Sequence, residues 1–309
     1  MKPPKKVFLY QSGVSLIELM ISITIGVVIL GAILAVYSAT SSTGKQSETA
    51  TRMSEDAAVA MNYMAGYIRM AGFSFPQANV PVNTAVSGTG TVQVNDSNFA
   101  GAGVRGCDAG FSNPTVSTTL SLTCNSGTGT AAISVRFEGD AYNTGPSGVN
   151  PTDCLSQAVN AATSSDFNGG PTYSLVESRF YVKTGANSGT PELYCGGNGG
   201  GSNFVAQPIM QYVESLVFTY GVADDVSSQV VTSYLTAAGV DLLPGSVDQR
   251  WSRVVSVKVC LVMRSEMPDQ NTPGSYINCA GNSVASTDRF LRKAFRSVVT
   301  LRNRGALSS

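Results

Sequence analysis

Residues 14–37 read Val-Ser-Leu-Ile-Glu-Leu-Met-Ile-Ser-Ile-Thr-Ile-Gly-Val-Val-Ile-Leu-Gly-Ala-Ile-Leu-Ala-Val-Tyr, and Glu18 is the only charged residue among them. The part after Glu18, from Leu19 to Tyr37, is nineteen residues long. As an α-helix it would measure about 28 Å, close to the ~30 Å thickness of the hydrocarbon core of a bilayer. This stretch is therefore long enough to cross a membrane as one helix.

The charges on either side predict the orientation of the helix. Lys2, Lys5 and Lys6 precede it, whereas only Lys45 and Arg52 follow within fifteen residues. The positive-inside rule therefore places the first residues in the cytoplasm and the large remainder outside. The apolar core is longer than the ~7 to 15 residues of a secretory signal. Composition favours a membrane anchor, and a cleaved signal is the alternative.

Glu18 does not fit a plain membrane anchor. An ionised carboxylate inside an apolar run costs a few kcal/mol unless it reaches water or a partner. In one interpretation, Glu18 lies at the cytoplasmic headgroup level and is hydrated. In the other, it is a buried charge that needs a cationic partner from another chain.

Helical periodicity continues beyond the membrane-spanning stretch. Apolar residues recur at every third or fourth position, with polar residues between them. The apolar residues are Met53, Ala57, Ala60, Met61, Met64 and Ile68. Gly72 is a suitable C-terminal cap and Pro76 follows it, so the helix should end near Ala71. We interpret the methionines of this stripe as core residues.

After Pro76 the pattern changes to short alternating runs, which are typical of strands. Their apolar positions are Ile133, Val135 and Phe137; Leu216, Phe218 and Tyr220; Val255, Val257, Val259, Leu261 and Met263; and Phe295, Val299 and Leu301. The stripe on the helix is the natural cover for such strands. The predicted fold class is α+β, with a long N-terminal helix packed on an antiparallel sheet. The Gly-, Ser- and Asn-rich stretches 77–130, 139–170 and 185–201 are expected to be surface insertions with short strands of their own.

All six cysteines follow the apolar stretch: Cys107, Cys124, Cys154, Cys195, Cys260 and Cys279. An even number outside the cytoplasm indicates disulfides, although six cysteines allow fifteen connectivities. We favour sequential pairing, 107 with 124, 154 with 195 and 260 with 279, each closing a loop worth about 3 kcal/mol in the chain-entropy model. A metal site would need closely spaced Cys or His ligands, which the sequence lacks.

The composition excludes much of enzyme chemistry. The 309 residues include no histidine, which removes histidine bases, histidine metal ligands and Ser-His-Asp triads. Twenty Lys+Arg balance twenty Asp+Glu, which gives no support to bulk nucleic-acid binding. The sequence shows no nucleophile with a base, no phosphate loop and no metal cluster. We therefore expect neither an enzyme nor a cofactor.

Two charged clusters have ordinary explanations. Asp224, Asp225 and Asp241 lack the alternating ligands and the glycine of a calcium loop, so we interpret them as loop acids. The C-terminal part carries a basic cluster: Arg289, Arg292, Lys293, Arg296, Arg302 and Arg304. Its spacing describes the hydrated face of a terminal strand, and contact with DNA is the less favoured interpretation.

The N-terminal residues resemble a known signal. Lys5-Lys6 followed by Gly13-Val14-Ser15-Leu16-Ile17-Glu18-Leu19 is similar to the class III signal of type IV pilins. The resemblance implies that a prepilin peptidase cuts between Gly13 and Val14, and that the new Val14 amine is methylated. It also implies that Glu18 pairs with the terminal amine of a neighbouring subunit during assembly. The sequence departs from the usual pattern in two ways: Val14 replaces the usual Phe, and Ala35 replaces a helix-breaking proline typical of major pilins.

Residues near both ends narrow the resemblance to the PilW family of minor pilins. The similar segments are 61–73, 218–225, 254–265 and 294–304. The resemblance implies a low-abundance subunit that primes type IV pilus assembly and lies at or near the pilus tip. The implied partners are other minor pilins, the major pilin, the prepilin peptidase, the inner-membrane assembly platform and a tip adhesin, with the lipid bilayer as the surroundings before assembly.

Together these features divide the chain into four segments. They are a cleaved leader 1–13, a membrane-spanning and filament-core helix half 14–40, an amphipathic helix half 41–72, and a β-rich domain 73–309. Before assembly this predicts a single-pass inner-membrane protein with a periplasmic domain, and after assembly a pilus subunit on the cell surface. Three alternatives remain: a minor pseudopilin of type II secretion, a membrane-tethered periplasmic enzyme, and a DNA-binding tip subunit for DNA uptake.

Overall fold

The computed structural model describes residues 13–82, 93–97, 101–116, 122–145, 150–163, 172–200, 204–268 and 272–303. The chain divides into two units, Met1–Thr49 and Ala50–Ser309. Lys2, Lys5, Lys6 and Arg304 of the predicted charge clusters lie outside the described residues.

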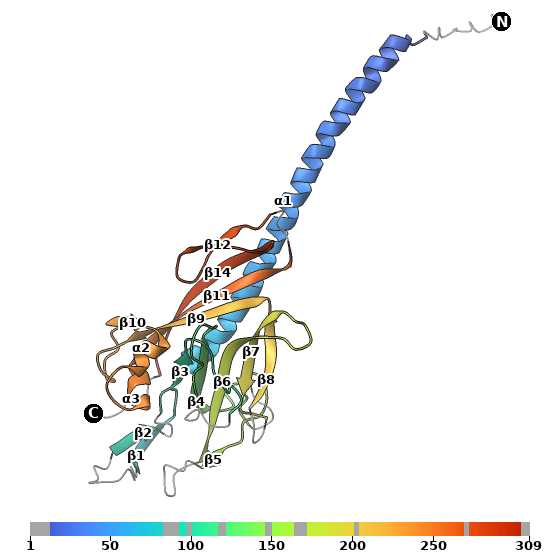
Figure 1. Cartoon of the computed structure of the whole chain (residues 1–309). Coiled ribbons are helices and arrows are strands. Elements are labelled where there is room, and N and C mark those ends of the chain that lie inside the picture. Colours follow the sequence, from blue (N-terminus) through green and yellow to red (C-terminus); the bar gives the residue numbers. More distant parts are fainter. Residues whose placement is uncertain are drawn as a thin grey trace, which may run out of the picture. The chain divides into compact units, whose positions relative to one another are not determined.

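Helix α1, Leu16–Met70, belongs to both units (Figure 1). Its start and end agree with the periodicity of the sequence to within one or two residues. Gly72 follows the helix with φ +76°, a left-handed conformation that glycine adopts without strain. Its N–H donates to the carbonyl of Arg136 (2.9 Å), so the chain leaves the helix already bonded to the sheet.

The second unit contains two larger antiparallel sheets (Figure 1). One has the order β10-β9-β11-β14, with β9 Val213–Val222, β10 Ser233–Leu235, β11 Val254–Pro268 and β14 Phe290–Thr300. The other has the order β3-β4-β6-β7-β8, with β5 paired beside β6; its strands are β3 Val104–Cys107, β4 Ala132–Gly139, β5 Ala162–Thr163, β6 Thr172–Thr184, β7 Pro191–Gly197 and β8 Val205–Gln211.

Two hairpins and two short helices complete the described structure. They are β1 Pro76–Val82 with β2 Gln93–Ser97, β12 Ser275–Ile277 with β13 Ser283–Ala285, α2 Ala237–Asp241, and α3 Val247–Trp251. Each short helix has a side-chain N-cap, Thr236 for α2 and Ser246 for α3. Such caps satisfy N–H groups that a helix start leaves free.

A single core joins α1 to both sheets. The predicted stripe on α1 is buried, and Met64 and Ile68 are fully covered. It packs with apolar residues of both sheets, including Phe180 of β6 and Leu261 of β11. At roughly 2 kcal/mol for each fully buried large apolar side chain, this contact stabilises the second half of α1. The α+β class is confirmed.

Two parts of the predicted sheet arrangement need correction. The strands form two larger sheets, where the prediction had one. The stretch 185–201 contains a short strand of its own, as expected, but this strand, β7, is not a surface insertion, because it pairs with both β6 and β8 and buries Leu193 in the core. The polar face of β4 is also buried, since Ser134 and Glu138 are only 1% and 4% exposed.

The two larger sheets are joined through one residue. β8 ends at Gln211, β9 begins at Val213, and Tyr212 between them has φ +62°. A left-handed conformation at a residue with a large side chain is uncommon and costs of order 1 kcal/mol. The carbonyl of Tyr212 accepts a hydrogen bond from the N–H of Arg264 (3.0 Å), which holds the bend against β11.

Candidate functional site

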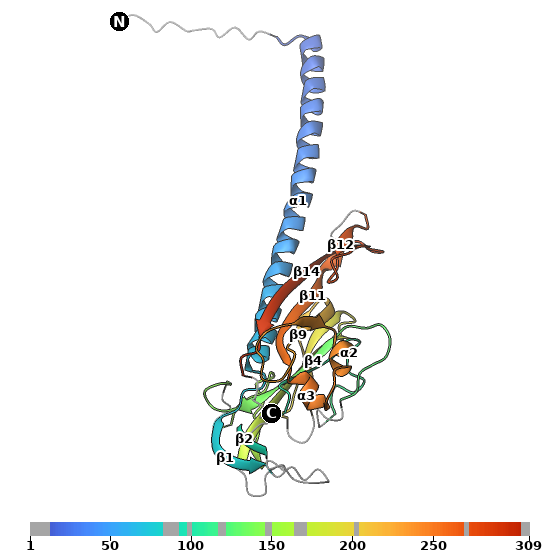
Figure 2. The ribbon, with the colours of Figure 1, turned by 90° about the vertical axis from the view of Figure 1, so that its left-hand side faces the viewer.

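The first half of α1 exposes an apolar surface. From Val14 to Tyr37 its large apolar side chains are between 52% and 76% exposed, which a water-soluble surface would not tolerate over such a length. The helix is long and apolar enough to cross a membrane, by length and composition. Figure 2 shows α1 from a second side.

Three hydroxyl groups in this part of the helix bond to carbonyls of the helix itself. Ser22 donates to the carbonyl of Glu18 (2.7 Å), and Thr24 donates to the carbonyls of Met20 and Ile21 (3.1 and 2.8 Å). Because each hydroxyl bonds to its own helix, it can enter an apolar environment without leaving an unpaired donor. Thr40 bonds in the same way to Val36 (2.8 Å).

The predicted processing and assembly residues lie at the start of α1. Gly13 and Val14 precede the helix, and Glu18 lies in its first turn. A carboxylate in the first turn is favoured by the helix dipole. Glu18 is exposed beside Ile17 and Leu19, which are 66% and 55% exposed. The structure therefore presents one carboxylate within an otherwise uncharged, mostly apolar surface.

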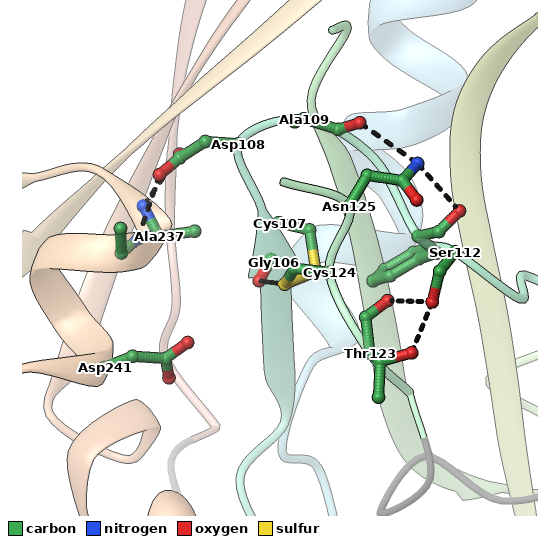
Figure 3. The surroundings of a disulfide bond; sticks show 12 residues. Gly106, Cys107, Asp108, Ala109, Ser112, Thr123, Cys124, Asn125, Ala237 and Asp241 are labelled. Carbon is green, nitrogen blue, oxygen red and sulfur yellow. Dashed lines mark hydrogen bonds between the residues drawn. A yellow bond between two sulfur atoms is a disulfide. The ribbon is translucent and has the colours of Figure 1, made fainter. Parts of the chain in front are cut away.

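The disulfide between Cys107 and Cys124 has Cα atoms 5.3 Å apart (Figure 3). It closes a loop over the β3-β4-β6-β7-β8 sheet, on the face turned away from the main core. Beneath the loop lies a small second core of Cys107, Phe111, Leu122, Ala132 and Tyr181. Beside the disulfide, Asp108 accepts hydrogen bonds from the N–H groups of Ala237 and Ala238 at the start of α2 (both 2.9 Å). The loop thus connects β3 to α2.

A buried ion pair holds the middle of this loop. The Nε of Arg179 lies 2.7 Å from the carboxylate of Glu177, and Nη1 donates to the carbonyls of Pro114 and Val116 (2.8 and 2.7 Å). Phe204 stacks on the guanidinium at 3.5 Å. Burial lowers the pKa of Arg179, and Glu177 opposes that shift. This pair was not predicted from the sequence, although its i, i+2 spacing on a strand places both side chains on one face.

The disulfide between Cys154 and Cys195 ties the segment 151–159 to β7, with Cα atoms 6.4 Å apart. Asp153 beside it is 1% exposed. Its carboxylate accepts hydrogen bonds from the N–H groups of Leu155, Gln157 and Gly199 (2.8, 3.0 and 2.7 Å).

Two tyrosines of α1 bind the same segment. Tyr63 donates to the carbonyl of Cys154, and Tyr67 donates to the carbonyl of Asp153 (3.2 Å). Burial raises the pKa of both phenols. These bonds fix the second half of α1 to the disulfide loop.

The disulfide between Cys260 and Cys279 attaches the β12–β13 hairpin to β11, with Cα atoms 5.8 Å apart. Arg296 of β14 donates to the carbonyl of Asn278 (2.5 Å) and adds a second attachment. All six cysteines are therefore paired in the sequential pattern that the sequence favoured.

The acidic residues singled out in the sequence do not form one site. Asp225 caps its own turn by accepting from the N–H groups of Ser227 and Ser228 (both 2.8 Å), and Asp241 accepts from the indole N–H of Trp251 (2.7 Å). Within the described ranges, no group of three or more His, Cys, Asp or Glu side chains could hold a metal ion.

The basic cluster is partly neutralised. Arg292 forms ion pairs with Glu214 (2.6 Å) and Asp288 (2.5 Å), and its side chain is only 10% exposed. The expectation that these positions form a hydrated face was therefore wrong for Arg292, because acids from β9 and from the turn before β14 cover it.

Comparison with known families agrees with these features. Residues 9–34 match the prokaryotic N-terminal methylation motif, and residues 179–303 match the family described as type IV pilus-assembly protein W. An exposed apolar helix with this motif, followed by a sheet domain that packs on the second half of the helix, defines the class of type IV pilins. Within that class, the two matches support a PilW-like pilin with a class III signal.

One solved structure similar to this chain is the type IV-like pilin TTHA1219 from Thermus thermophilus. The two are 10% identical, with a TM-score of 0.37 over 82% of this chain and 98% of that chain. No curated protein matches the chain. The methylation motif and the apolar helix support a membrane-anchored pilin, and the match to a pilus-assembly family implies interaction with other pilus components.

Proposed function

We propose that this PilW-like chain is a minor pilin that primes type IV pilus assembly and is incorporated at or near the pilus tip. The observation that carries the proposal is the exposed apolar surface from Val14 to Tyr37 with Glu18 as its only charge. Such a surface must be covered, by lipid before assembly and by neighbouring helices afterwards. Exchanging one apolar environment for the other costs little free energy, so specific contacts can decide the outcome.

Processing prepares the end of the helix for this exchange. A prepilin peptidase cuts between Gly13 and Val14, and the new Val14 amine is methylated. Segment 14–40 then spans the inner membrane and later enters the filament core, while segments 41–72 and 73–309 lie on the periplasmic side. The partners are other minor pilins, the major pilin, the assembly platform and a tip adhesin.

Glu18 sets the register of assembly in this mechanism. A carboxylate within an apolar environment costs a few kcal/mol when it has no partner. The terminal amine of a neighbouring subunit supplies the opposite charge, and this gain is available only when the two helices are correctly staggered.

Replacement of Glu18 tests the mechanism. Glu18→Ala should leave a processed, membrane-inserted subunit that enters the pilus poorly, measured by immunoblotting of sheared pili against membranes. Glu55→Ala, an exposed glutamate in the second half of α1, is the matched control and should incorporate normally. Normal piliation with Glu18→Ala would contradict the role of this carboxylate.

Two further measurements test the class of system. The mass of the N-terminal peptide should correspond to a chain that starts at methylated Val14 and should revert to the uncut form without the peptidase. Deletion of the gene should remove surface pili. Loss of protein secretion with normal piliation would indicate a pseudopilin instead.

A further inference from the structure

Strand β14 is the last strand of its sheet. The sheet order is β10-β9-β11-β14, so β11 covers one side of β14. In the part of the chain that the structure describes, no strand pairs with its other side. Figure 2 shows β14 beside α1, on the side of the molecule that faces the viewer.

The pattern of hydrogen bonds between β14 and β11 shows which backbone groups of β14 point to the free edge. The N–H of Leu301 donates to the carbonyl of Val255 (2.9 Å), whereas Thr300 lies opposite Ser256. In an antiparallel ladder, alternate residues bond to the neighbouring strand. Odd-numbered residues of β14 therefore bond to β11, and the following residues direct their N–H and C=O groups away from it: Arg292, Ala294, Arg296, Val298 and Thr300.

This edge is regular and prepared to pair. The register with β11 is continuous from Thr300 opposite Ser256 to Arg292 opposite Arg264. Neither a proline nor a bulge interrupts it over that length, so the backbone of this edge is open to pairing. The cations of the strand are a device that opposes pairing with a like-charged strand. One face of β14 is held in the core through Val299, so the strand is already ordered. A row of fixed donors and acceptors of this kind binds extended peptides by strand addition.

The charges of β14 indicate which kind of peptide would pair with its free edge. Its sequence, FLRKAFRSVVT, contains three cations and no anion. Arg292 is neutralised by Glu214 and Asp288. Lys293 instead contacts the hydroxyl of Ser54 (3.4 Å), and Arg296 donates to the carbonyl of Asn278. Among the described residues, neither cation forms an ion pair. A second copy of β14 would bring like charges together, whereas a strand with acidic residues would pair favourably.

We propose that the free edge of β14 binds an extended, acidic segment of another protein chain as a fifth strand of this sheet. The contact goes beyond the proposed assembly mechanism, because it uses the β-domain and does not involve Glu18 or the apolar half of α1. Main-chain hydrogen bonds hold the segment in place, and Lys293 and Arg296, on opposite faces of β14, select acidic residues on both faces of the added strand.

The test uses the full-length chain in its native cells, with the photo-cross-linking amino acid benzoylphenylalanine at Thr300. In this background Val298→Pro removes one N–H group that faces the edge and leaves the bonds to β11 intact, since proline is tolerated where the N–H faces outward. Val298→Ala keeps the N–H and is the matched control. Val298 is 57% exposed, so neither change opens the core.

We expect cross-links to one extended, acidic segment of another chain. Val298→Pro should lower their yield about fivefold or more, the effect of losing at least one hydrogen bond, and Val298→Ala should not. Lys293→Glu leaves the backbone unchanged and should lower the yield roughly threefold, which provides a test if the proline variant misfolds. Equal yields for the Pro and Ala variants when both fold, no effect of Lys293→Glu, or a cross-linked peptide from a second copy of this chain would each overturn the proposal.

Discussion

Arg292 on β14 donates two hydrogen bonds to Glu214 on β9, at 2.6 and 2.8 Å, across the intervening strand β11. The residue of β11 directly opposite Arg292 is Arg264, whose Nη1 lies 3.8 Å from the same carboxylate. Like charges opposite each other in a sheet are destabilising. Glu214 therefore links three strands by compensating two facing arginines.

Replacing Glu214 by Gln should lower the free energy of unfolding by about 1–3 kcal/mol, because two partly buried arginines lose their shared anion. Urea unfolding of the full chain in detergent measures the effect. Glu55→Gln, an exposed glutamate on α1, should change stability by less than about 0.5 kcal/mol. Equal effects of the two changes would show that the cross-strand pair contributes little.

Asp288 should make stability depend on pH in the acid range. Hydrogen bonding to Arg292 lowers the pKa of this carboxyl to about 2, against about 3.9 in an unfolded chain. The unfolded state therefore binds the proton first as the pH falls. The contribution of Asp288 is complete above about pH 4 and is lost as the pH falls towards 2. Between pH 5 and pH 2, the free energy of unfolding should fall less steeply for Asp288→Asn than for the natural chain. Identical slopes for the two proteins would refute this prediction.

Asp153→Asn should destabilise the disulfide loop on which α1 rests. The buried carboxylate accepts from three N–H groups, and an amide would turn a donor towards them, at a cost of about 2–4 kcal/mol. Hydrogen exchange should accelerate at Leu155, Gln157 and Gly199. Asp140→Asn is the control, since Asp140 also accepts from two N–H groups but lies nearer the surface; its cost should be below about 1 kcal/mol.

Two of the three disulfides should differ in their contribution to stability. Cys154–Cys195 closes a loop of 41 residues and lies in the main core, whereas Cys260–Cys279 closes one of 19. The chain-entropy model gives about 4 kcal/mol for the first and about 3 kcal/mol for the second. Replacing each pair by alanines and comparing melting temperatures should therefore show the larger loss for Cys154 and Cys195. The reverse order would show that the attached hairpin stabilises the sheet more than the central loop does.

The sequence alone determined the long helix and its end, the α+β class, the clearest strands and the apolar surface around Glu18. These features depend on local periodicity and on transfer free energies, which are properties of neighbouring residues. The resemblance in residues 13–19 and in the C-terminal segments added the pilin class, and the family comparisons confirmed it.

Only the tertiary structure decided how the polar residues are used. Asp153 binds the N–H groups of Leu155, Gln157 and Gly199, and Glu214 pairs with Arg292 across β11. Glu177 pairs with Arg179 two residues further along the same strand, under the cover of a distant loop. Their burial depends on which segment covers which face, and no local pattern encodes this. For the same reason the sequence did not show that β7 lies inside a sheet, or that the edge of β14 remains free. Both follow from strand order, which is fixed by long-range contacts.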